Sequence, residues 1–532
     1  MVSSQNAVKS ATGAYQVVKA LEDAGVSQIF GYPGACILSL YDELASSDQI
    51  SHCLCRHEQA CVHAAEGYAR VSGKIGVVLV TSGPGATNTV TGIANAYADS
   101  TPLLVLAGTT NESSGKIFQY VDFESMVKST VKKIYSPKED ESLYDVIFDA
   151  INTANEGKRG PVVVQLSRAA LETSNVISFP QSKTENLHSI PVEEINYLIN
   201  LLSKAKNPLF LIGGGCRDSF LEISELAAAL SINVVTTLMG VGCISSQIPT
   251  YKGMIGVNGL DEANEILFNS DLIVAFGVAY SDRSICKSRT FANGTPVVNI
   301  NIEPYRFDNV NIVGEITADC NDVLKVLKQK MIPNIQYYDL VSKENKFKNS
   351  DEKMMTEEVL SCINEYTKQM SPIVITDVGQ HQMVAAQCFE FTAPRRFLTS
   401  GGLGTMGFGL PASCGVYFAA PNACIINITG DGSFQMNIQE LATVREYQIP
   451  VKIFVMNNGY LGMIRQAQEK LYEGRYYQSK MNNPDFITLA NGYDIEGYRV
   501  TSTEQLQELL PIIFGSNKPT IVDCITKEIE RV

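Results

Sequence analysis

Two apolar runs in the C-terminal part of the chain are each followed at once by polar residues that could do chemistry. The run CIINIT precedes a Gly-Asp-Gly sequence centred on Asp431, and the run VKIFVM precedes Asn457 and Asn458. The intervening FQMNIQELATVREYQ has helical spacing, so the segment predicts a parallel strand–helix–strand unit. Parallel strands end on one edge of their sheet, and we therefore expect Asp431 and Asn458 to lie side by side there.

A carboxylate and an amide oxygen are hard ligands that suit Mg²⁺, which takes one or two protein ligands together with phosphate oxygens. Gly430 and Gly432 would let backbone amides approach an anion, and the following helix would point its N-terminus at the same place. The pattern predicts a Mg²⁺–diphosphate site at Asp431 and Asn458. Either end alone is equally explained by an ordinary turn, and the pairing of both at adjacent strand ends favours the metal site.

The elements that must position these residues alternate between short apolar strands and helices along the whole chain, which is typical of α/β architecture. We predict three doubly wound parallel-sheet domains, at residues 1–174, 190–335 and 355–532. The first and third repeat a layout of strand, glycine-rich loop and helix, which indicates two modules of one type. The polar stretches ETSNVISFPQSKTENLHSIP and NIQYYDLVSKENKFKNSDEKMM are predicted as linkers.

Composition excludes several classes of function. The 532 residues carry a net charge of −14, which argues against nucleic-acid binding. No apolar run is long enough for a membrane span, and the first residues contain no secretory-type apolar core, so we expect no membrane partner. Thirteen cysteines without a CxxC pair are expected to stay reduced in a cytoplasmic protein, and five scattered histidines make a zinc site improbable.

The order and number of several motifs make the chain resemble the thiamine diphosphate enzymes, and among them the acetohydroxyacid (acetolactate) synthase catalytic subunit. These motifs are GDGS followed by NN, TSGPGATN, TTLMGVG, DVGQHQM, SGGLGTMGFGLPA and NNGYLGMIRQ. The resemblance covers nearly the whole chain and implies a pyrimidine-binding, a central FAD-type and a diphosphate-binding domain. It also implies that Mg²⁺ is held by Asp431, Asn458 and the main-chain carbonyl of Tyr460.

The segment CLCRHEQACVHAAEGYAR supplies a second candidate for chemistry. Glu58 lies where a helix is predicted to begin, a place where a carboxylate also favours the helix dipole. The resemblance implies instead that Glu58 hydrogen-bonds the aminopyrimidine ring of the cofactor, in an apolar pocket that raises the pKa of a carboxyl group. Glu66, on the same predicted helix, is the alternative.

Further contacts are implied by the resemblance alone. Met406 would hold the cofactor in a bent conformation, although a core methionine is a reasonable alternative. Gln119 would lie near the reacting centre, or else be a solvated loop amide. The other thiamine diphosphate contacts are implied to be Pro84, Asn88, Val378, Gln380, His381, Gly404, Gly430, Gly432, Ser433, Gly462 and Met463.

The middle block resembles the family's FAD-binding domain, in which the flavin is structural. A central domain without FAD is the alternative, because the segment FGVAYSDR has Ala279 and Ser281 where the family usually has an arginine and an aspartate. The implied FAD contacts are Gly213, Gly214, Gly215, Thr237, Leu238, Asn258, Gly277, Arg283, Asn301, Ile302 and Asp319.

Three residues bear on the substrate. Ala467 in RQAQ stands where the family carries a tryptophan, and loss of an indole opens ~150 Å² of contact surface, so we expect a roomier acceptor pocket. Ala35 in YPGA replaces a glycine near the reaction centre. Arg465 could grip an acceptor carboxylate with two hydrogen bonds, or be a helix-surface arginine.

We therefore predict a thiamine diphosphate- and Mg²⁺-dependent carboligase of acetolactate-synthase type. It would decarboxylate pyruvate and transfer the two-carbon hydroxyethyl/acetyl unit to an acceptor carbonyl, of pyruvate or another keto compound. The alternatives are a related carboligase with an aldehyde or keto-sugar acceptor, a 2-oxo acid decarboxylase, and a non-catalytic partner subunit. In this family Glu58 and Asp431 would meet across a subunit interface, which implies a homodimer at least, or a homotetramer.

Overall fold

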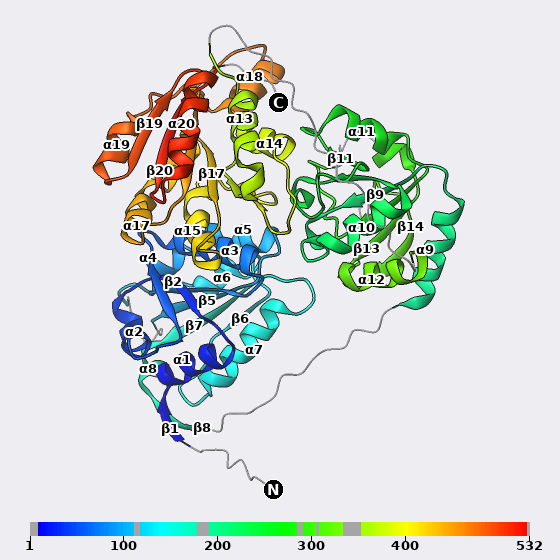
Figure 1. The fold of residues 1–532 in the computed structure, drawn as a ribbon. Coiled ribbons are helices and arrows are strands. Elements are labelled where there is room, and N and C mark those ends of the chain that lie inside the picture. The colour runs from blue at the N-terminus through cyan, green and yellow to red at the C-terminus, as the bar shows by residue number, and fades with distance from the viewer. Residues whose placement is uncertain are drawn as a thin grey trace. The chain divides into compact units, whose positions relative to one another are not determined.

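The computed structural model describes residues 9–110, 117–177, 191–284, 291–304, 308–332 and 353–528. These residues form three six-stranded parallel sheets with helices, together with a two-stranded antiparallel sheet of β1 (Lys9–Thr12) and β8 (Ser174–Ile177) (Figure 1). The predicted α/β class with three parallel-sheet domains is confirmed. The two polar stretches predicted as linkers lie mostly outside the described residues.

The N-terminal sheet has the strand order β3-β2-β4-β5-β7-β6, with all neighbours parallel. Its strands are β2 (Gln28–Tyr32), β3 (Ser51–Leu54), β4 (Gly76–Val80), β5 (Leu103–Thr109), β6 (Lys133–Tyr135) and β7 (Pro161–Ser167). The helices of this module are α1 (Gly13–Asp23), η1 (Ala35–Ile37), α2 (Leu38–Leu44), α3 (Glu58–Ser72), α4 (Pro84–Thr87), α5 (Val90–Ala98), α6 (Phe123–Val127), α7 (Leu143–Asn155) and α8 (Arg168–Glu172).

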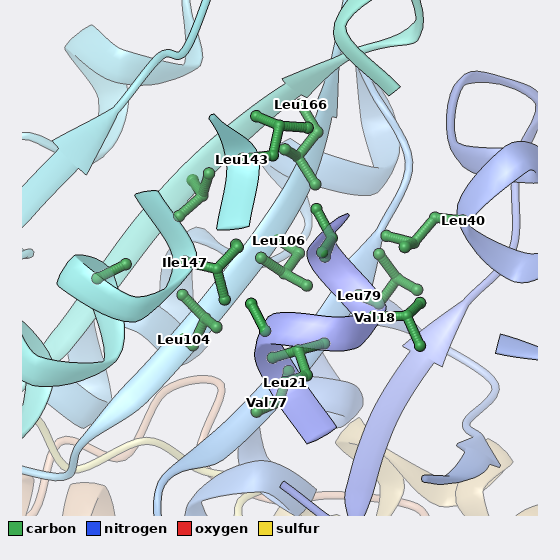
Figure 2. Close-up of a cluster of buried hydrophobic side chains, with 14 of the residues drawn as sticks. Val18, Leu21, Leu40, Val77, Leu79, Leu104, Leu106, Leu143, Ile147 and Leu166 are labelled. Carbon is green, nitrogen blue, oxygen red and sulfur yellow. The ribbon is translucent and has the colours of Figure 1, made fainter. Parts of the chain in front are cut away.

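Both faces of this sheet are apolar, which is why its strands are continuous hydrophobic runs. Val77 and Leu79 of β4 belong to the buried cluster with side chains of α1, α2 and α7, shown in Figure 2. Val78 and Val80, which point to the opposite face, join a second cluster with α3. Burying each such side chain contributes about 2 kcal/mol, so helices are needed on both faces.

The central sheet has the order β11-β10-β9-β12-β13-β14, again all parallel. By position along the chain this is the order 3-2-1-4-5-6 of dinucleotide-binding folds. The strands are β9 (Pro208–Ile212), β10 (Asn233–Thr236), β11 (Tyr251–Met254), β12 (Leu272–Phe276), β13 (Val297–Asn301) and β14 (Ile312–Thr317). The helices are α9 (Val192–Lys204), η2 (Gly214–Cys216), α10 (Phe220–Leu230), η3 (Leu238–Gly240), α11 (Asp261–Phe268), η4 (Phe291–Gly294) and α12 (Cys320–Met331).

The C-terminal sheet has the order β16-β15-β17-β18-β20-β19, with all neighbours parallel. Its strands are β15 (Ile373–Thr376), β16 (Phe397–Leu398), β17 (Ile425–Gly430), β18 (Lys452–Asn457), β19 (Glu496–Val500) and β20 (Thr520–Ile525). The helices are α13 (Thr356–Thr367), η5 (Lys368–Met370), α14 (Gln380–Cys388), α15 (Gly409–Ala419), α16 (Asp431–Met436), η6 (Ile438–Glu440), α17 (Leu441–Glu446), α18 (Gly462–Tyr472), α19 (Phe486–Gly492) and α20 (Thr503–Gly515).

The first and last sheets share one topology. In each, the second strand along the chain lies at the edge beside the first, followed by the third, fourth, sixth and fifth. The central sheet follows a different order. Two modules of one topology therefore lie before and after a different one along the chain, as the repeated strand, glycine-rich loop and helix pattern predicted.

The helix predicted between β17 and β18 is broken in the structure. It begins at Asp431, three residues earlier than predicted, and is interrupted at Asn437, whose φ is −133°. The Asn437 Nδ2 donates to the carbonyl of Gly407 at 2.7 Å, and its Oδ1 accepts from Gln439 at 3.0 Å. A short amide side chain that bonds the backbone competes with helix formation, and the broken helix follows from it.

The described chain divides into two compact units, each considered by itself. The first unit comprises Met1–Asn186, Gly402–Asn422 and Met436–Ile449, and the second comprises the rest. In the first unit α15 packs on α3 so closely that a Cβ on Gly67 or Gly415 would clash with the backbone of the facing helix. Among the described residues no helix is both long and apolar enough to cross a membrane.

Candidate active site

The carboxylate of Asp431 lies at the carboxyl ends of two paired strands. Strands β17 and β18 are in register, with Gly430 opposite Met456, so the loops that follow them meet. The Asp431 Oδ2 accepts from the Gly459 amide at 2.8 Å, and Oδ1 accepts from the Gly432 amide at 2.8 Å. The structure therefore brings Asp431 beside the Asn458 loop, as the strand pattern predicts.

One side of this carboxylate stays open to a ligand. Its Oδ2 accepts a second hydrogen bond, from Asn483 Nδ2 at 2.8 Å, which fills both lone pairs of that oxygen. Among the described residues Oδ1 has a hydrogen bond from Gly432 alone, which leaves one lone pair for a cation. Burial raises the pKa of the Asp431 carboxyl, and a bound cation would offset that effect.

Asn458 and Tyr460 flank Gly459, whose amide donates to the other carboxylate oxygen, Oδ2. Asn458 Oδ1 accepts from the Tyr460 amide at 2.9 Å, a short turn that holds both residues in place. The carboxylate and the amide oxygen have the hardness that Mg²⁺ requires, and so does the main-chain carbonyl of Tyr460. The donor set fits the predicted ion, and its role as a metal site stays a prediction.

Asn483 is a residue that the sequence reasoning missed. Its Nδ2 donates to both Asp431 and Asn457, at 2.8 and 3.0 Å, and its Oδ1 accepts from Gln435 at 3.1 Å. Asn457 in turn donates to the buried Asp523 at 2.9 Å. Asn483 lies in the coil MNNPD before α19, and nothing in its local sequence signals this contact.

The predicted diphosphate contacts gather at the same sheet edge in the second unit. Gln380 and His381 begin α14 after β15, and a Cβ on Gly430 would lie 3.0 Å from the His381 ring. A Cβ on Gly462 would clash with the end of the Gln380 side chain, which would have to move to admit it. The remaining members are Val378, whose carbonyl accepts from Ser433 Oγ at 3.1 Å, Gly432 in α16, and Met463 in α18.

His381 supports the presence of an external polar group. Its Nε2 is buried and has no hydrogen-bond partner among the described residues. Burial lowers the pKa of this imidazole to about 4, so the ring is neutral at pH 7. A buried polar atom without a partner is costly, and a bound group at this edge would satisfy it. A phosphate oxygen can only accept, so it pairs with Nε2 when that nitrogen carries a proton. The residues present fit a diphosphate group.

A second group of predicted residues lies in the first unit. Glu58 is the first residue of α3, and its Oε2 accepts from Asn88 Nδ2 at 2.9 Å. Its Oε1 faces Gly85, where an added Cβ would lie 3.5 Å away, so the glycine leaves room beside that oxygen. Asn88, in the same module, thus binds one oxygen of Glu58, and there is space beside the other oxygen.

Neighbouring loops complete this group. Gln119 has a φ of 64°, and its Oε1 accepts from Ser82 Oγ at 3.3 Å. Ser82 lies just before Pro84, the first residue of α4. Ala35 begins η1 after Gly34, which lies against the Thr81 side chain. Glu58, Asn88, Pro84, Gln119 and Ala35 all follow strands β2 to β5 of one sheet.

The rival carboxylate, Glu66, lies inside the module. It is fully buried and hydrogen-bonds His63 Nδ1 and Asn95 Nδ2 at 3.0 Å each. Its oxygens are engaged by the protein itself. This placement favours Glu58 over Glu66 as the group that meets a cofactor.

Gly404 and Met406 also belong to the first unit, in the segment before α15. Gly404 has a φ of 75° and is exposed, and Met406 is half-buried. Neither is a core residue, so the alternative of a core methionine loses support. Asp431 and Asn458 lie in the second unit.

The predicted substrate residue Arg465 is engaged by its own chain. Its guanidinium lies 4.0 Å from the ring centre of Tyr460 and 5.0 Å from that of Tyr476, and it donates to the Glu528 carbonyl at 3.2 Å. Ala467 lies on the same helix, α18, and is half-buried. Their roles toward an acceptor stay predictions.

The predicted FAD contacts follow the carboxyl ends of the six central strands. The sheet order reverses between β9 and β12, and there Gly213 and Gly215 pack so tightly on Gly277 that a Cβ on either would collide with it. The other members of the set lie at the same ends of the strands. They are Gly214 in η2, Thr237 and Leu238 at the start of η3, Asn258 after β11, Asn301 at the end of β13, Ile302 after it, Asp319 capping α12, and the exposed Arg283.

Comparison with known families agrees with this geometry. Residues 11–126 match the thiamine pyrophosphate enzyme N-terminal TPP binding domain, 195–327 the central domain and 377–524 the C-terminal TPP binding domain. The chain belongs to the thiamine pyrophosphate enzymes. Thiamine pyrophosphate is thiamine diphosphate under another name, so the predicted family and its main cofactor are confirmed.

Relatives narrow the group further. The acetolactate synthase isozyme 3 large subunit of Escherichia coli (strain K12) is 38% identical over 525 residues, which cover 94% of this chain and 91% of the relative. The acetolactate synthase large subunit of Haemophilus influenzae is 36% identical over 551 residues, with 99% and 96% covered. That of Buchnera aphidicola subsp. Schizaphis graminum (strain Sg) is 38% identical over 522 residues, with 94% and 91% covered. The chain is a thiamine diphosphate-dependent carboligase of acetolactate-synthase type.

We predict that His381 makes the cofactor-free protein less stable in acid. The imidazole has a pKa of 6.5 when unfolded and about 4 when folded. Between these values the unfolded chain binds a proton that the folded chain does not. The free energy of unfolding should therefore fall as pH falls from 6.5 to 4, by up to about 3 kcal/mol from this group. Urea unfolding of the unmodified chain and of His381→Gln across this range measures the effect, and equal pH slopes would contradict it.

Proposed function

We propose that this carboligase decarboxylates pyruvate and joins the two-carbon hydroxyethyl/acetyl unit to the carbonyl of an acceptor, either a second pyruvate or another keto compound. The observation that carries the proposal is the placement of Glu58. Its carboxylate is held by Asn88 on one oxygen and lies beside Gly85 on the other, in a chain that matches acetolactate synthases over nearly its full length.

Bound thiamine diphosphate supplies the carbon nucleophile that adds to the 2-oxo acid and takes up the electron pair left when CO₂ departs. The protein must orient the cofactor's aminopyrimidine ring and hold a proton there. We assign this to Glu58, through the oxygen that faces Gly85, with Asn88 fixing the orientation of the carboxyl group. Gln119 is proposed to stand near the reacting carbon.

The diphosphate end is assigned to the second unit. We propose that Mg²⁺ binds Asp431 through Oδ1, together with Asn458 and the Tyr460 carbonyl, and that His381 Nε2 and the amides near Gly430 meet phosphate oxygens. The open lone pair on Asp431 and the unpartnered His381 nitrogen support this. With Glu58 in the other unit, the family resemblance supports a homodimer at least, or a homotetramer, which sedimentation would test.

We also propose that the central domain binds FAD as a structural group. Its dinucleotide-type strand order, and the glycines at the point where that order reverses, support this. The replacements Ala279 and Ser281 remove two polar contacts and should weaken the binding. A cytoplasmic location remains a prediction from the cysteine content.

The acceptor is the open part of the proposal. Arg465 would reach an acceptor carboxylate only after leaving the Glu528 carbonyl, and Ala467 leaves space where the family has an indole. These two residues leave pyruvate, a bulkier keto compound, an aldehyde and a keto-sugar as candidate acceptors. A product analysis decides between them.

We expect pyruvate, thiamine diphosphate and Mg²⁺ to yield CO₂ and acetolactate, and Glu58→Gln to lower turnover by at least about 100-fold, because a neutral amide cannot move the proton. Glu193→Gln, an exposed first-turn change in α9, should leave turnover unaltered. Products are assayed with pyruvate alone and with a panel of acceptors. Acetaldehyde in place of acetolactate would replace the synthase with a decarboxylase.

For the metal, we expect Asn483→Ala to weaken Mg²⁺ binding about tenfold or more, because losing a residue that orients a ligand usually has this effect. Calorimetric titration with Mg²⁺ at saturating thiamine diphosphate measures it. Asn482→Ala, at the exposed neighbouring residue, is the matched control. Equal Mg²⁺ affinity in the two variants would refute this role for Asn483.

For the flavin, we expect purified protein to carry the visible absorption of FAD, released on denaturation in a molar ratio below or near one per chain. Restoring a cation by Ala279→Arg should raise that ratio after reconstitution with FAD, because the pyrophosphate gains a charge partner. A colourless protein that takes up no FAD at millimolar concentration would rule the flavin out.

A further inference from the structure

The segment Gly402–Met406 is tied to helix α5 of the N-terminal module by one partly buried and one buried hydrogen bond. The Gly402 amide donates to Asp99 Oδ1 at 2.7 Å, and Thr405 Oγ1 donates to Asn95 Oδ1 at 3.0 Å. Asn95 lies in α5, and Asp99 is the residue directly after the end of this helix. The two residues are four positions apart, so both side chains lie on one face of the helix. The two bonds enclose Leu403 and Gly404 and immediately precede Met406.

Each acceptor on α5 is itself held in one orientation. Asn95 Nδ2 donates to both oxygens of Glu66 at 3.0 Å, which fixes its amide so that Oδ1 faces Thr405. Glu66 is held in turn by His63 at 3.0 Å. Asp99 Oδ2 accepts from Arg70 at 3.4 Å, which leaves Oδ1 directed at Gly402.

This polar group is deeply buried. Asn95, Glu66 and His63 are fully buried, and Thr405 is 9% exposed. Hydrogen bonds between such groups are expensive to leave unmade, because water cannot replace the lost partner. Gly402, Leu403 and Gly404 are by contrast exposed, and Gly404 has a positive φ. The two ties therefore help to hold an exposed stretch of backbone in one conformation.

We propose that Asn95 and Asp99 are positioning residues, which hold the Gly402–Met406 backbone in the shape that receives the pyrimidine end of the cofactor. The proposal rests on the proposed function, since it takes Gly404 and Met406 as cofactor contacts. Helix α3 then contributes two residues to the site. Glu58 is its first residue, and Glu66, two turns later, orients Asn95.

The ties are not needed to hold the fold. Helix α15, which follows the segment, is already fastened to α3 by the close approach at Gly67 and Gly415. Removing one hydrogen bond at Thr405 should therefore leave α15 in place and loosen only the residues before it. This separates a positioning role from a purely structural one.

The test is Thr405→Val, which keeps the side-chain shape and removes the hydroxyl. We expect its dissociation constant for thiamine diphosphate, measured by calorimetry with saturating Mg²⁺, to rise on the order of tenfold, as loss of one buried hydrogen bond implies. The KM for pyruvate at saturating cofactor should be unchanged. Thr405→Ser, which restores the hydroxyl, should restore the affinity, and Thr405→Ala repeats the comparison if the valine variant does not fold.

Thr367→Val is the matched control, because Thr367 is also buried and donates to the Ile363 carbonyl within α13. It should bind thiamine diphosphate as the unmodified chain does. Unaltered cofactor affinity in Thr405→Val, or failure of Thr405→Ser to recover it, would overturn the positioning role. If the unmodified chain itself binds no thiamine diphosphate, the proposed function fails instead.

Discussion

A buried carboxylate must have its oxygens satisfied, and the arrangement of the C-terminal sheet edge depends on this requirement at Asp431. Its hydrogen bonds come from the Gly432 amide, the Gly459 amide and Asn483, which belong to three separate segments. Because the Gly459 amide donates to the carboxylate that follows β17, the loops after β17 and β18 are drawn together. The result is a fixed edge with one carboxylate lone pair left over, next to the neutral imidazole of His381, whose Nε2 has no hydrogen-bond partner among the described residues.

The first unit is organised by a different constraint, the close packing of two helices. Gly67 of α3 and Gly415 of α15 leave no space for a side chain, so the two backbones touch. This brings the segment before α15 against α5, where buried polar side chains can reach it. A part of the chain that is C-terminal in sequence thereby becomes part of the N-terminal module.

Glycine-rich loops of similar sequence have different structural roles in the three sheets. Gly213 and Gly215 permit two backbone loops to pack on each other, whereas Gly85 leaves room beside a carboxylate oxygen. Gly430 and Gly432 lie at a strand end on either side of Asp431, where the Gly432 amide donates to the Asp431 carboxylate. The strand order, not the glycine content, separates the central domain from its two neighbours.

Much of this protein was determined by its sequence alone, because the relevant interactions are local or follow from strand periodicity. The alternation of apolar runs and helices predicted three parallel sheets, and the strand-end rule predicted that Asp431 and Asn458 would be neighbours. Glu58 was predicted from its place at the start of a helix together with a family motif, and the structure places it at the first residue of α3. The broken helix after Asp431 was missed, since its cause is a hydrogen bond from Asn437 to the distant Gly407.

The tertiary structure decided what no local pattern encodes. Asn483 reaches Asp431 across 52 positions, and Thr405 reaches Asn95 across 310, so neither contact leaves a signal in the surrounding residues. The structure also distinguished Glu58 from Glu66, which lie on one helix and differ in burial and partners. The physical reason is the same in each case. Side-chain hydrogen bonds in a buried site depend on which segments the packed core brings together, and hydrophobic periodicity along the sequence does not determine which segments meet.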